Sequence, residues 1–219
     1  MTTSSTVTTS DTSADAATRR RFASTKRATK ETSIEIEIEI DGTGLVETST
    51  GIPFFDHMLA QLGKHGGFDL RVKCVGDLEI DTHHTIEDVG IALGEAFRRS
   101  LGDKVGVRRF ASIAVPLDEA LIEVAVDLSG RPFLHYEVDP SGGTGQTFLL
   151  GEPGFDPQLT EEFWRAFVMS SMVTLHIGMV RGKNAHHIIE ASFKAVARAL
   201  RDAVRLDGGS GIPSTKGAL

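Results

Sequence analysis

Two histidine-rich segments of the chain share one pattern. Residues 81–88 read Asp-Thr-His-His-Thr-Ile-Glu-Asp, and residues 184–190 read Asn-Ala-His-His-Ile-Ile-Glu. Each contains His-His-x-Ile-Glu, follows residue types that cap helix N-termini, and opens a run with helical spacing. Residues four apart lie on one face of a helix, so the first histidine and the glutamate of each motif can bind one metal ion together.

The motifs thus offer two ligand pairs and two further single donors. The pairs are His83 with Glu87, and His186 with Glu190. The second histidine of each motif, His84 or His187, lies about 100° round the helix and is directed away from its pair. One such motif is common in surface or packing positions, but two copies, each at the start of a helix, indicate a two-metal site.

Composition and charge exclude several classes of protein. The chain has 219 residues, of which 40% are hydrophobic, as expected for one globular domain or two small lobes. Its net charge of −7 and isoelectric point near 5.6 argue against a general binder of nucleic acid or anionic membranes. Any phosphate must therefore be bound by a few placed basic residues.

The single cysteine and the hydropathy pattern indicate the cellular setting. Cys74 alone excludes an internal disulfide and a cysteine-based zinc site, and we expect it to be an apolar strand residue. We find no apolar run of membrane-spanning length and no secretory signal, which predicts a cytoplasmic protein. The basic run at residues 19–21 leaves a plastid-targeting peptide as the alternative.

The chain between the motifs predicts an α+β fold that is internally duplicated. The alternation of Ser33–Ile40 predicts a half-exposed strand, with Leu45–Ser49 as its hairpin partner. Strands, helix, strand and helix then follow in each half. The expected helices cover 53–67, 83–101, 159–171 and 186–205, and the other expected strands cover 68–75, 108–116, 121–128, 132–138 and 173–179. The predicted organisation is a disordered tail at 1–29, a first half at 30–106, a second half at 107–205, and a substrate-binding tail at 206–219.

Registering the two halves identifies the remaining ligands. Registered without gaps from the first helix of each half, His57 corresponds to Glu162, and a loop that differs by only two residues then brings the His-His motifs into correspondence. A pseudo-twofold axis then predicts two sites: the first from His57, His84, His186 and Glu190, and the second from His83, Glu87, Glu162 and His187. Imidazole and carboxylate without thiolate suit Mn²⁺, Fe²⁺ or Zn²⁺, and Mn²⁺ is our first choice.

Other polar residues are weaker candidates taken singly. Arg109 and Arg131 offer the planar donor fork that binds phosphate, although isolated arginines are more often solvated. Lys194 is directed either toward the site or toward solvent, and His65 either caps a helix end or lines the site. We expect His135 at the surface and His176 on a strand. The remaining candidates are Glu31, before the first expected strand, and Ser214, Thr215 and Lys216 in the C-terminal tail.

Several long motifs resemble those of the imidazoleglycerol-phosphate dehydratase family. They occur in the family's order over about residues 30–219. They are Thr-Gly-Ile-Pro-Phe-Phe-Asp-His-Met-Leu (50–59), Asp-Thr-His-His-Thr-Ile-Glu-Asp (81–88), Leu-Ser-Gly-Arg-Pro (128–132), Gly-Lys-Asn-Ala-His-His-Ile-Ile-Glu-Ala (182–191) and Ile-Pro-Ser-Thr-Lys-Gly (212–217).

The resemblance carries its own expectations for fold, assembly and site. It implies helices packed between two β-sheets, similar to the second domain of ribosomal protein S5, and a homo-oligomeric shell of twenty-four subunits. It also implies two Mn²⁺ ions per active site, with ligands from more than one subunit. The residues that match substrate-contacting positions are Glu31, His57, His65, Arg109, Arg131, Lys194, Ser214, Thr215 and Lys216, with Glu31 and His65 as acid/base candidates.

Glu162 departs from the family pattern, which commonly has histidine at this position. Either Glu162 itself or His176 completes the second metal site. The activity that the resemblance implies is dehydration of D-erythro-imidazole-glycerol phosphate to imidazole-acetol phosphate in histidine biosynthesis. A two-metal phosphoesterase, or a non-enzymatic metal-binding shell, would use the same ligand types and stays as the alternative.

Overall fold

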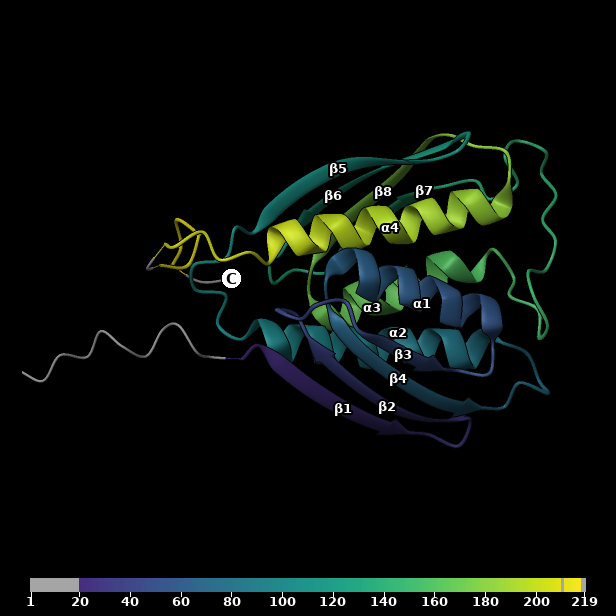
Figure 1. The fold of residues 1–219 in the computed structure, drawn as a ribbon, viewed down its shortest axis with the longest axis horizontal. Coiled ribbons are helices and arrows are strands. Elements are labelled where there is room, and N and C mark those ends of the chain that lie inside the picture. The colour runs from purple at the N-terminus through teal and green to yellow at the C-terminus, as the bar shows by residue number, and fades with distance from the viewer. Residues whose placement is uncertain (1–19, 210, 218–219) are drawn as a thin grey trace, which may run out of the picture.

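Two four-stranded sheets enclose four helices in the computed structural model, which describes residues 20–209 and 211–217 (Figure 1). The first sheet has the order β1-β2-β4-β3 and the second has the order β5-β6-β8-β7. In each sheet the last-named strand is parallel to its neighbour and the other pairs are antiparallel. The strands are β1 (Phe22–Ala28), β2 (Thr32–Glu39), β3 (Val46–Ser49), β4 (Asp69–Gly76), β5 (Phe110–Leu117), β6 (Ala120–Asp127), β7 (Phe133–Glu137) and β8 (Thr174–Arg181). The matching order confirms the predicted duplicated α+β fold.

The alternation in the sequence places one face of each sheet in the core. In β2, Ile34, Ile36 and Ile38 are buried while the glutamates between them lie on the other face. The central strand of the second sheet, β6, buries Ile122 and Val124 in the same way. Each sheet therefore presents an apolar face to the helices between them.

Each contact between helices across the centre joins the two halves. The helices are α1 (Pro53–Gly66), α2 (His83–Leu101), α3 (Leu159–Ser171) and α4 (Ala185–Ala203). The helix α2 covers the first sheet and α4 covers the second, as Figure 1 shows. Across the centre, α1 packs on α4 and α3 packs on α2. The two helices that begin with the histidine motifs thus each meet a helix of the opposite half.

The α2–α3 contact brings the two backbones together through glycine. A Cβ at Gly94 would lie 2.5 Å from the carbonyl oxygen of Phe167, and one at Gly90 would lie 2.8 Å from that of Phe163. In the register of the repeat, Phe193 and Ala197 take these places on α4, and both are buried. The two helix pairs therefore have the same topology but different packing.

The first strand was not predicted. We expected residues 1–29 to be disordered, but β1 spans Phe22–Ala28 and pairs antiparallel with β2. Arg27 reaches the buried Asp88 of α2, with Nη2 2.8 Å from Oδ1, which fixes β1 onto the helix. The sequence of β1 alternates only weakly between apolar and polar residues. Its strand conformation therefore depends on backbone pairing with β2. The part of the prediction that concerns residues 1–19 lies outside the described residues.

The expected hairpin between residues 33–40 and 45–49 was also wrong. The strand β3 pairs in parallel with β4, and β2 lies between β1 and β4. The Asp69 carboxylate at the start of β4 accepts hydrogen bonds from the backbone N–H groups of Thr43 (2.7 Å) and Leu45 (3.0 Å). This tertiary contact holds the turn at residues 43–45 beside the start of β4, so the following strand β3 pairs with β4 and not with β2.

Cys74 agrees with its prediction as an apolar strand residue. It is buried in β4, and burial raises the pKa of its thiol to about 11. In the described ranges, no helix combines the length and apolar character needed to cross a membrane.

Candidate functional site

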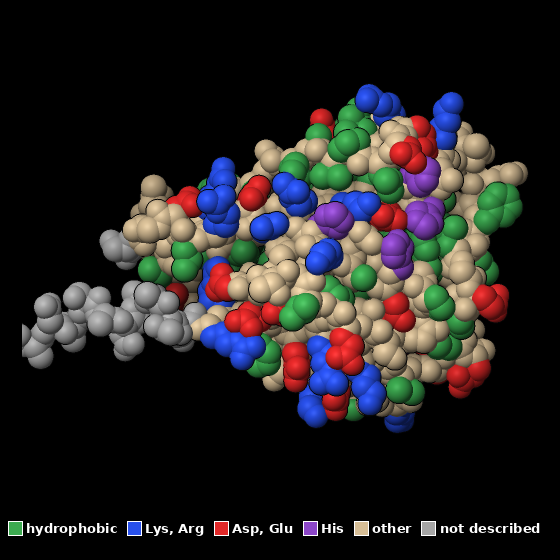
Figure 2. All heavy atoms as spheres, in the orientation of Figure 1, with side chains coloured by type: hydrophobic (Ala, Val, Ile, Leu, Met, Phe, Trp, Pro, Cys, Tyr) green, Lys and Arg blue, Asp and Glu red, His purple; other side chains and the backbone are tan. Residues whose placement is uncertain are grey.

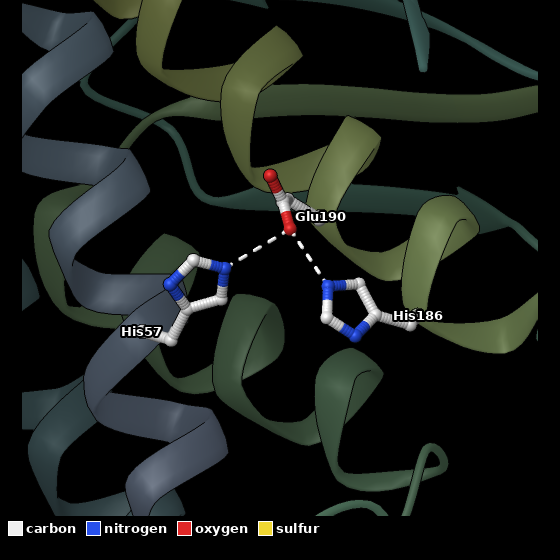
Figure 3. Close-up of side chains that lie close together, drawn as sticks. All are labelled: His57, His186 and Glu190. Carbon is white, nitrogen blue, oxygen red and sulfur yellow. Dashed lines mark hydrogen bonds and ion pairs between the residues drawn. The ribbon is translucent and has the colours of Figure 1, made fainter. Parts of the chain in front are cut away.

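One helix from each half brings together His57, His186 and Glu190. The Nε2 atoms of His57 and His186 lie 3.0 Å and 2.8 Å from the same carboxylate oxygen, Oε2 of Glu190 (Figure 3). One donor atom from each residue falls within 4.8 Å of the others. In residues 20–209 and 211–217 this is the one group of three or more such side chains that could hold a metal ion.

Local capping places the two α4 residues. The Asn184 side chain accepts hydrogen bonds from the backbone N–H groups of His186 (2.9 Å) and His187 (3.3 Å), so α4 begins directly before the motif. The i, i+4 spacing then places His186 and Glu190 on one face. The Phe54 ring packs edge-on against the His186 ring, with centroids 5.2 Å apart, and limits its rotation.

The Glu190 carboxylate is a buried anion held by cations and imidazoles. Only 8% of Glu190 is exposed, and its Oε1 lies 2.6 Å from the Lys194 ammonium. Burial raises the pKa of the carboxyl, but hydrogen bonds from Lys194, His57 and His186 outweigh that effect and lower the pKa to about 2. Lys194, for which two orientations were open, is thus directed into the site.

His65 lies two turns from His57 on the same helix. Its Nε2 is 3.1 Å from the side-chain oxygen of Gln61, and Gln61 also lies beside His57. Burial, followed by the charges of Lys194 and Arg198, lowers the pKa of the imidazole. These neighbours favour the role of His65 as a residue that lines the site over that of a helix cap. A neutral imidazole can accept a proton, so His65 is a candidate base. Figure 2 shows histidine side chains gathered with basic ones over α1 and α4.

His84, the fourth predicted ligand of the first site, is held elsewhere in the chain. Its Nδ1 lies 3.0 Å and 3.2 Å from the two carboxylate oxygens of Asp77. That hydrogen bond raises the pKa of His84. The backbone N–H of Asp77 donates to the carbonyl of Glu31 (3.1 Å), so Glu31 belongs to this second cluster. One chain therefore assembles three of the four predicted ligands.

The second predicted site does not come together within one chain. His83 Nε2 lies 3.8 Å from Glu87 Oε2, and the backbone N–H of His83 donates to Asp81. Glu162 instead faces Arg165, one turn further along α3, with Oε2 3.7 Å from Nε, while the closer ion pair of Arg165 is with Glu161. The charge of Arg165 attracts this carboxylate along its own helix.

His187 is bound to a carboxylate of the loop between β5 and β6. Its Nδ1 lies 2.8 Å from Oε2 of Glu119. The bond to His187, with backbone N–H donors that include Asn184, lowers the pKa of the Glu119 carboxyl to about 2. His187 thus resembles His84, and both lie apart from the ligand pair of their own motif.

Arg109 and the C-terminal tail meet. The Arg109 guanidinium forms a two-point ion pair with Asp127, at 2.7 Å and 3.1 Å, and donates to the carbonyl of Pro213 at 2.7 Å. Its backbone φ is +75°, a strained value for a residue with a side chain. This contact brings Arg109 next to the segment that holds Ser214, Thr215 and Lys216.

The other candidates lie outside these clusters. Arg131 is exposed beside the end of β6, with its carbonyl hydrogen-bonded to Ser129 and Thr174. His135 and His176 lie side by side on the outer face of the second sheet, with ring centroids 5.4 Å apart. Both positions agree with the expected strand and surface roles.

Sequence reasoning missed three carboxylates that hold candidate residues. Asp77 and Glu119 bind His84 and His187, and Asp127 binds Arg109. None of them stands at a fixed helical spacing from its partner, so no local pattern identifies them.

Comparison with known proteins identifies the family of the chain. The family model for imidazoleglycerol-phosphate dehydratase matches residues 50–200. The chain belongs to the imidazoleglycerol-phosphate dehydratase family. It is 58% identical to the imidazoleglycerol-phosphate dehydratase of Acidothermus cellulolyticus over 200 residues, which cover 91% of this chain and 93% of the relative. The enzyme of the same name from Gluconacetobacter diazotrophicus is 55% identical over 201 residues, covering 91% and 98%.

Solved structures of the family share the fold. The Staphylococcus aureus imidazoleglycerol-phosphate dehydratase superposes with a TM-score of 0.73 at 34% identity, covering 84% of this chain and 99% of that one. The Pyrococcus furiosus enzyme, in complex with (S)-C348, gives 0.72 at 37% identity, covering 89% and 100%. The chain is accordingly a hydro-lyase of histidine biosynthesis.

Proposed function

We propose that this enzyme dehydrates D-erythro-imidazole-glycerol phosphate to imidazole-acetol phosphate and water with two Mn²⁺ ions per active site. The observation that carries the metal dependence is the convergence of His57, His186 and Glu190 on one point between the two halves. Two imidazole nitrogens and one carboxylate oxygen form a donor set that fits Mn²⁺. When bound, such ions act as Lewis acids and as a template for the substrate's imidazole and hydroxyl.

The predicted ligands divide between the two ions. His57, His186 and Glu190 would hold one ion together with a copy of His84. His83, Glu87 and Glu162 would hold the other together with a copy of His187, although Arg165 must release Glu162 for this. With His176 on the outer face of the second sheet, we assign the position to Glu162.

The positions of His84 and His187 support the proposal that ligands are shared between subunits. Each is partly exposed and bound to a carboxylate away from its own motif's pair. We therefore propose a homo-oligomeric shell of twenty-four subunits, with active sites between subunits, in which each chain supplies His84 and His187 to neighbours. The cytoplasm is the proposed location.

The protein's own residues supply proton transfer and substrate positioning. Glu31 lies in the His84 cluster and is the proposed acid/base that removes the carbon-bound proton. His65, whose pKa is lowered by burial and by the charge of Lys194, is the second candidate. Both residues would reach one substrate only where subunits meet.

The phosphate would be bound by basic residues around the C-terminal tail. Arg109 is oriented by Asp127 and lies against Pro213, next to Ser214, Thr215 and Lys216. Arg131 and Lys216 complete the proposed set of phosphate-binding cations, and Lys194 is a proposed substrate contact beside Glu190. Fixing the phosphate fixes the reacting carbons against the acid/base groups.

The products of the reaction provide the test. Metal-stripped protein should be inactive, and addition of Mn²⁺ should restore formation of a ketone that keeps its phosphate. Release of inorganic phosphate would instead indicate the phosphoesterase alternative. Metal binding without turnover or analogue binding would indicate a storage or structural role, and full activity without metal would contradict the proposal.

A further inference from the structure

His84 and His187 share an arrangement that His57 and His186 do not. His84 Nδ1 lies 3.0 Å from an Asp77 oxygen, and His187 Nδ1 lies 2.8 Å from a Glu119 oxygen. In the Glu190 cluster the carboxylate meets Nε2 instead. The protein therefore presents its histidines in two different ways.

The contact between Glu119 and His187 is rigid. The other Glu119 oxygen accepts hydrogen bonds from the backbone N–H groups of Lys183 (3.1 Å) and Asn184 (2.8 Å), directly before α4. Asn184 in turn caps α4 at the residues that carry the ring. The carboxylate and the imidazole are thus anchored to the same helix N-terminus.

The contact between Asp77 and His84 is built from different parts of the repeat. Asp77 follows β4 and is tied to the Glu31 carbonyl at the start of β2. In the register that places His84 on His187, Asp77 falls on Val180 and not on Glu119. The same pairing of a carboxylate with Nδ1 therefore occurs at positions that do not correspond in the repeat. The duplication alone does not account for it.

An ionised carboxylate can only accept hydrogen bonds, so Nδ1 of each ring must carry the proton. In a neutral imidazole the lone pair then lies on Nε2, the other nitrogen. The side chains of His84 and His187 are 34% and 29% exposed, and Nε2 of His187 has an Asp118 carboxylate oxygen 3.8 Å away.

We propose that Asp77 and Glu119 are positioning residues, which hold His84 and His187 in the Nδ1–H form and present each Nε2 as a metal donor to a neighbouring chain. This inference rests on the proposed function, because the neighbouring site must bind a metal ion. The carboxylates raise the donor strength of the rings and fix their orientation without contacting the ion or the substrate.

The direct test compares Mn²⁺ binding by native protein, E119Q and D77N. Titration followed by electron paramagnetic resonance gives the affinity of each site, and light scattering gives the assembled mass. We expect each variant to weaken one class of Mn²⁺ site by about 10- to 100-fold, the usual effect of losing such a partner. Matched controls are E123Q, at an exposed position of β6, and E79Q, near Asp77, which should change the affinity less than twofold.

Histidine nitrogen shifts from solid-state nuclear magnetic resonance provide a second readout that does not depend on the variants folding. At alkaline pH, where the rings are neutral, native protein without metal should show His84 and His187 as Nδ1–H imidazoles. Nε2–H forms in the native protein, or unchanged affinity in assembled E119Q and D77N, would overturn the inference while native Mn²⁺ binding left the proposed function intact. Native protein that binds no Mn²⁺ would instead contradict the proposed function.

Discussion

The α1–α4 corner and the α2–α3 corner are built on the same plan but prepare their ligands differently. Each joins a His-x-x-x-Glu pair of one half to a residue from the other half's first helix. At the first corner, His57 completes a group around Glu190. At the second, Glu162 faces Arg165 instead of the His83–Glu87 pair. The two halves therefore share the arrangement of helices, but the side chain at position 57 or 162 decides whether one chain forms a metal-ligand group at that corner.

Packing differs between the corners in the same way. The α2–α3 pair is in close backbone contact at Gly90 and Gly94, whereas buried side chains occupy the corresponding positions of α4. We infer that the α2–α3 pair contributes rigid packing and that the α1–α4 pair contributes the preformed ligand group.

The largest effect should come from disrupting the close helix contact with G94A. The new methyl group would lie 2.5 Å from the Phe167 carbonyl oxygen, so the helices must separate. We expect a loss of about 3 kcal/mol in the free energy of unfolding, at the upper end for overpacking. The matched variant A197G, at the corresponding place on α4, should cost about 1 kcal/mol through helix propensity. Equal effects of the two variants in urea denaturation would contradict the packing difference.

Removing the shared carboxylate should abolish the preformed ligand group. In E190Q the amide no longer supplies the charged oxygen that both imidazoles approach, so we expect Mn²⁺ affinity at that site to fall by at least about 100-fold. Elemental analysis after dialysis should show about one fewer ion per chain. The control E87Q, at the corresponding place in α2, should leave the tight site filled. Retention of both ions by E190Q would show that Glu190 is not a ligand.

Replacing Glu162 with histidine should make the second corner resemble the first. In E162H an imidazole takes the position that His57 has at the α1–α4 corner, and it no longer pairs with Arg165. We expect the weaker Mn²⁺ site to tighten by about tenfold, or 1.4 kcal/mol. The reciprocal variant H57E should weaken the tighter site. No change in E162H would place Glu162 outside the metal site.

The smallest effect should follow from removing only the competing cation. R165Q frees Glu162 from a partly exposed ion pair, and such pairs contribute about 1 kcal/mol or less. We expect the weaker site to tighten by no more than about fivefold in the same titration. A larger gain would mean that Arg165 is the main reason for the difference between the corners.

The sequence predicted most of the framework because its signals are local. Alternation predicted β2, and the histidine motifs predicted the starts of α2 and α4, where Asn184 caps α4 but Thr82 makes no side-chain cap on α2. Registering the repeat also predicted the meeting of His57 with His186 and Glu190 across the two halves.

The remaining features depend on tertiary contacts that have no local signature. The strand β1 is fixed by pairing with β2, and β3 is led to β4 by the Asp69 carboxylate. The partners of His84, His187 and Arg109 come from distant loops and strands. The pairing of Glu162 with Arg165 reflects a competition between nearby charges, which the register of the repeat does not address.

The most direct test of the account is Mn²⁺ titration of metal-free native protein, with the number and affinity of the sites per chain as the result. We predict two sites of unequal affinity, of which the tighter one is lost in E190Q and the weaker one is lost in E87Q. Two sites of equal affinity would contradict the difference between the corners. A single site, or loss of the weaker site in E190Q, would contradict the assignment of the preformed ligand group to the α1–α4 corner.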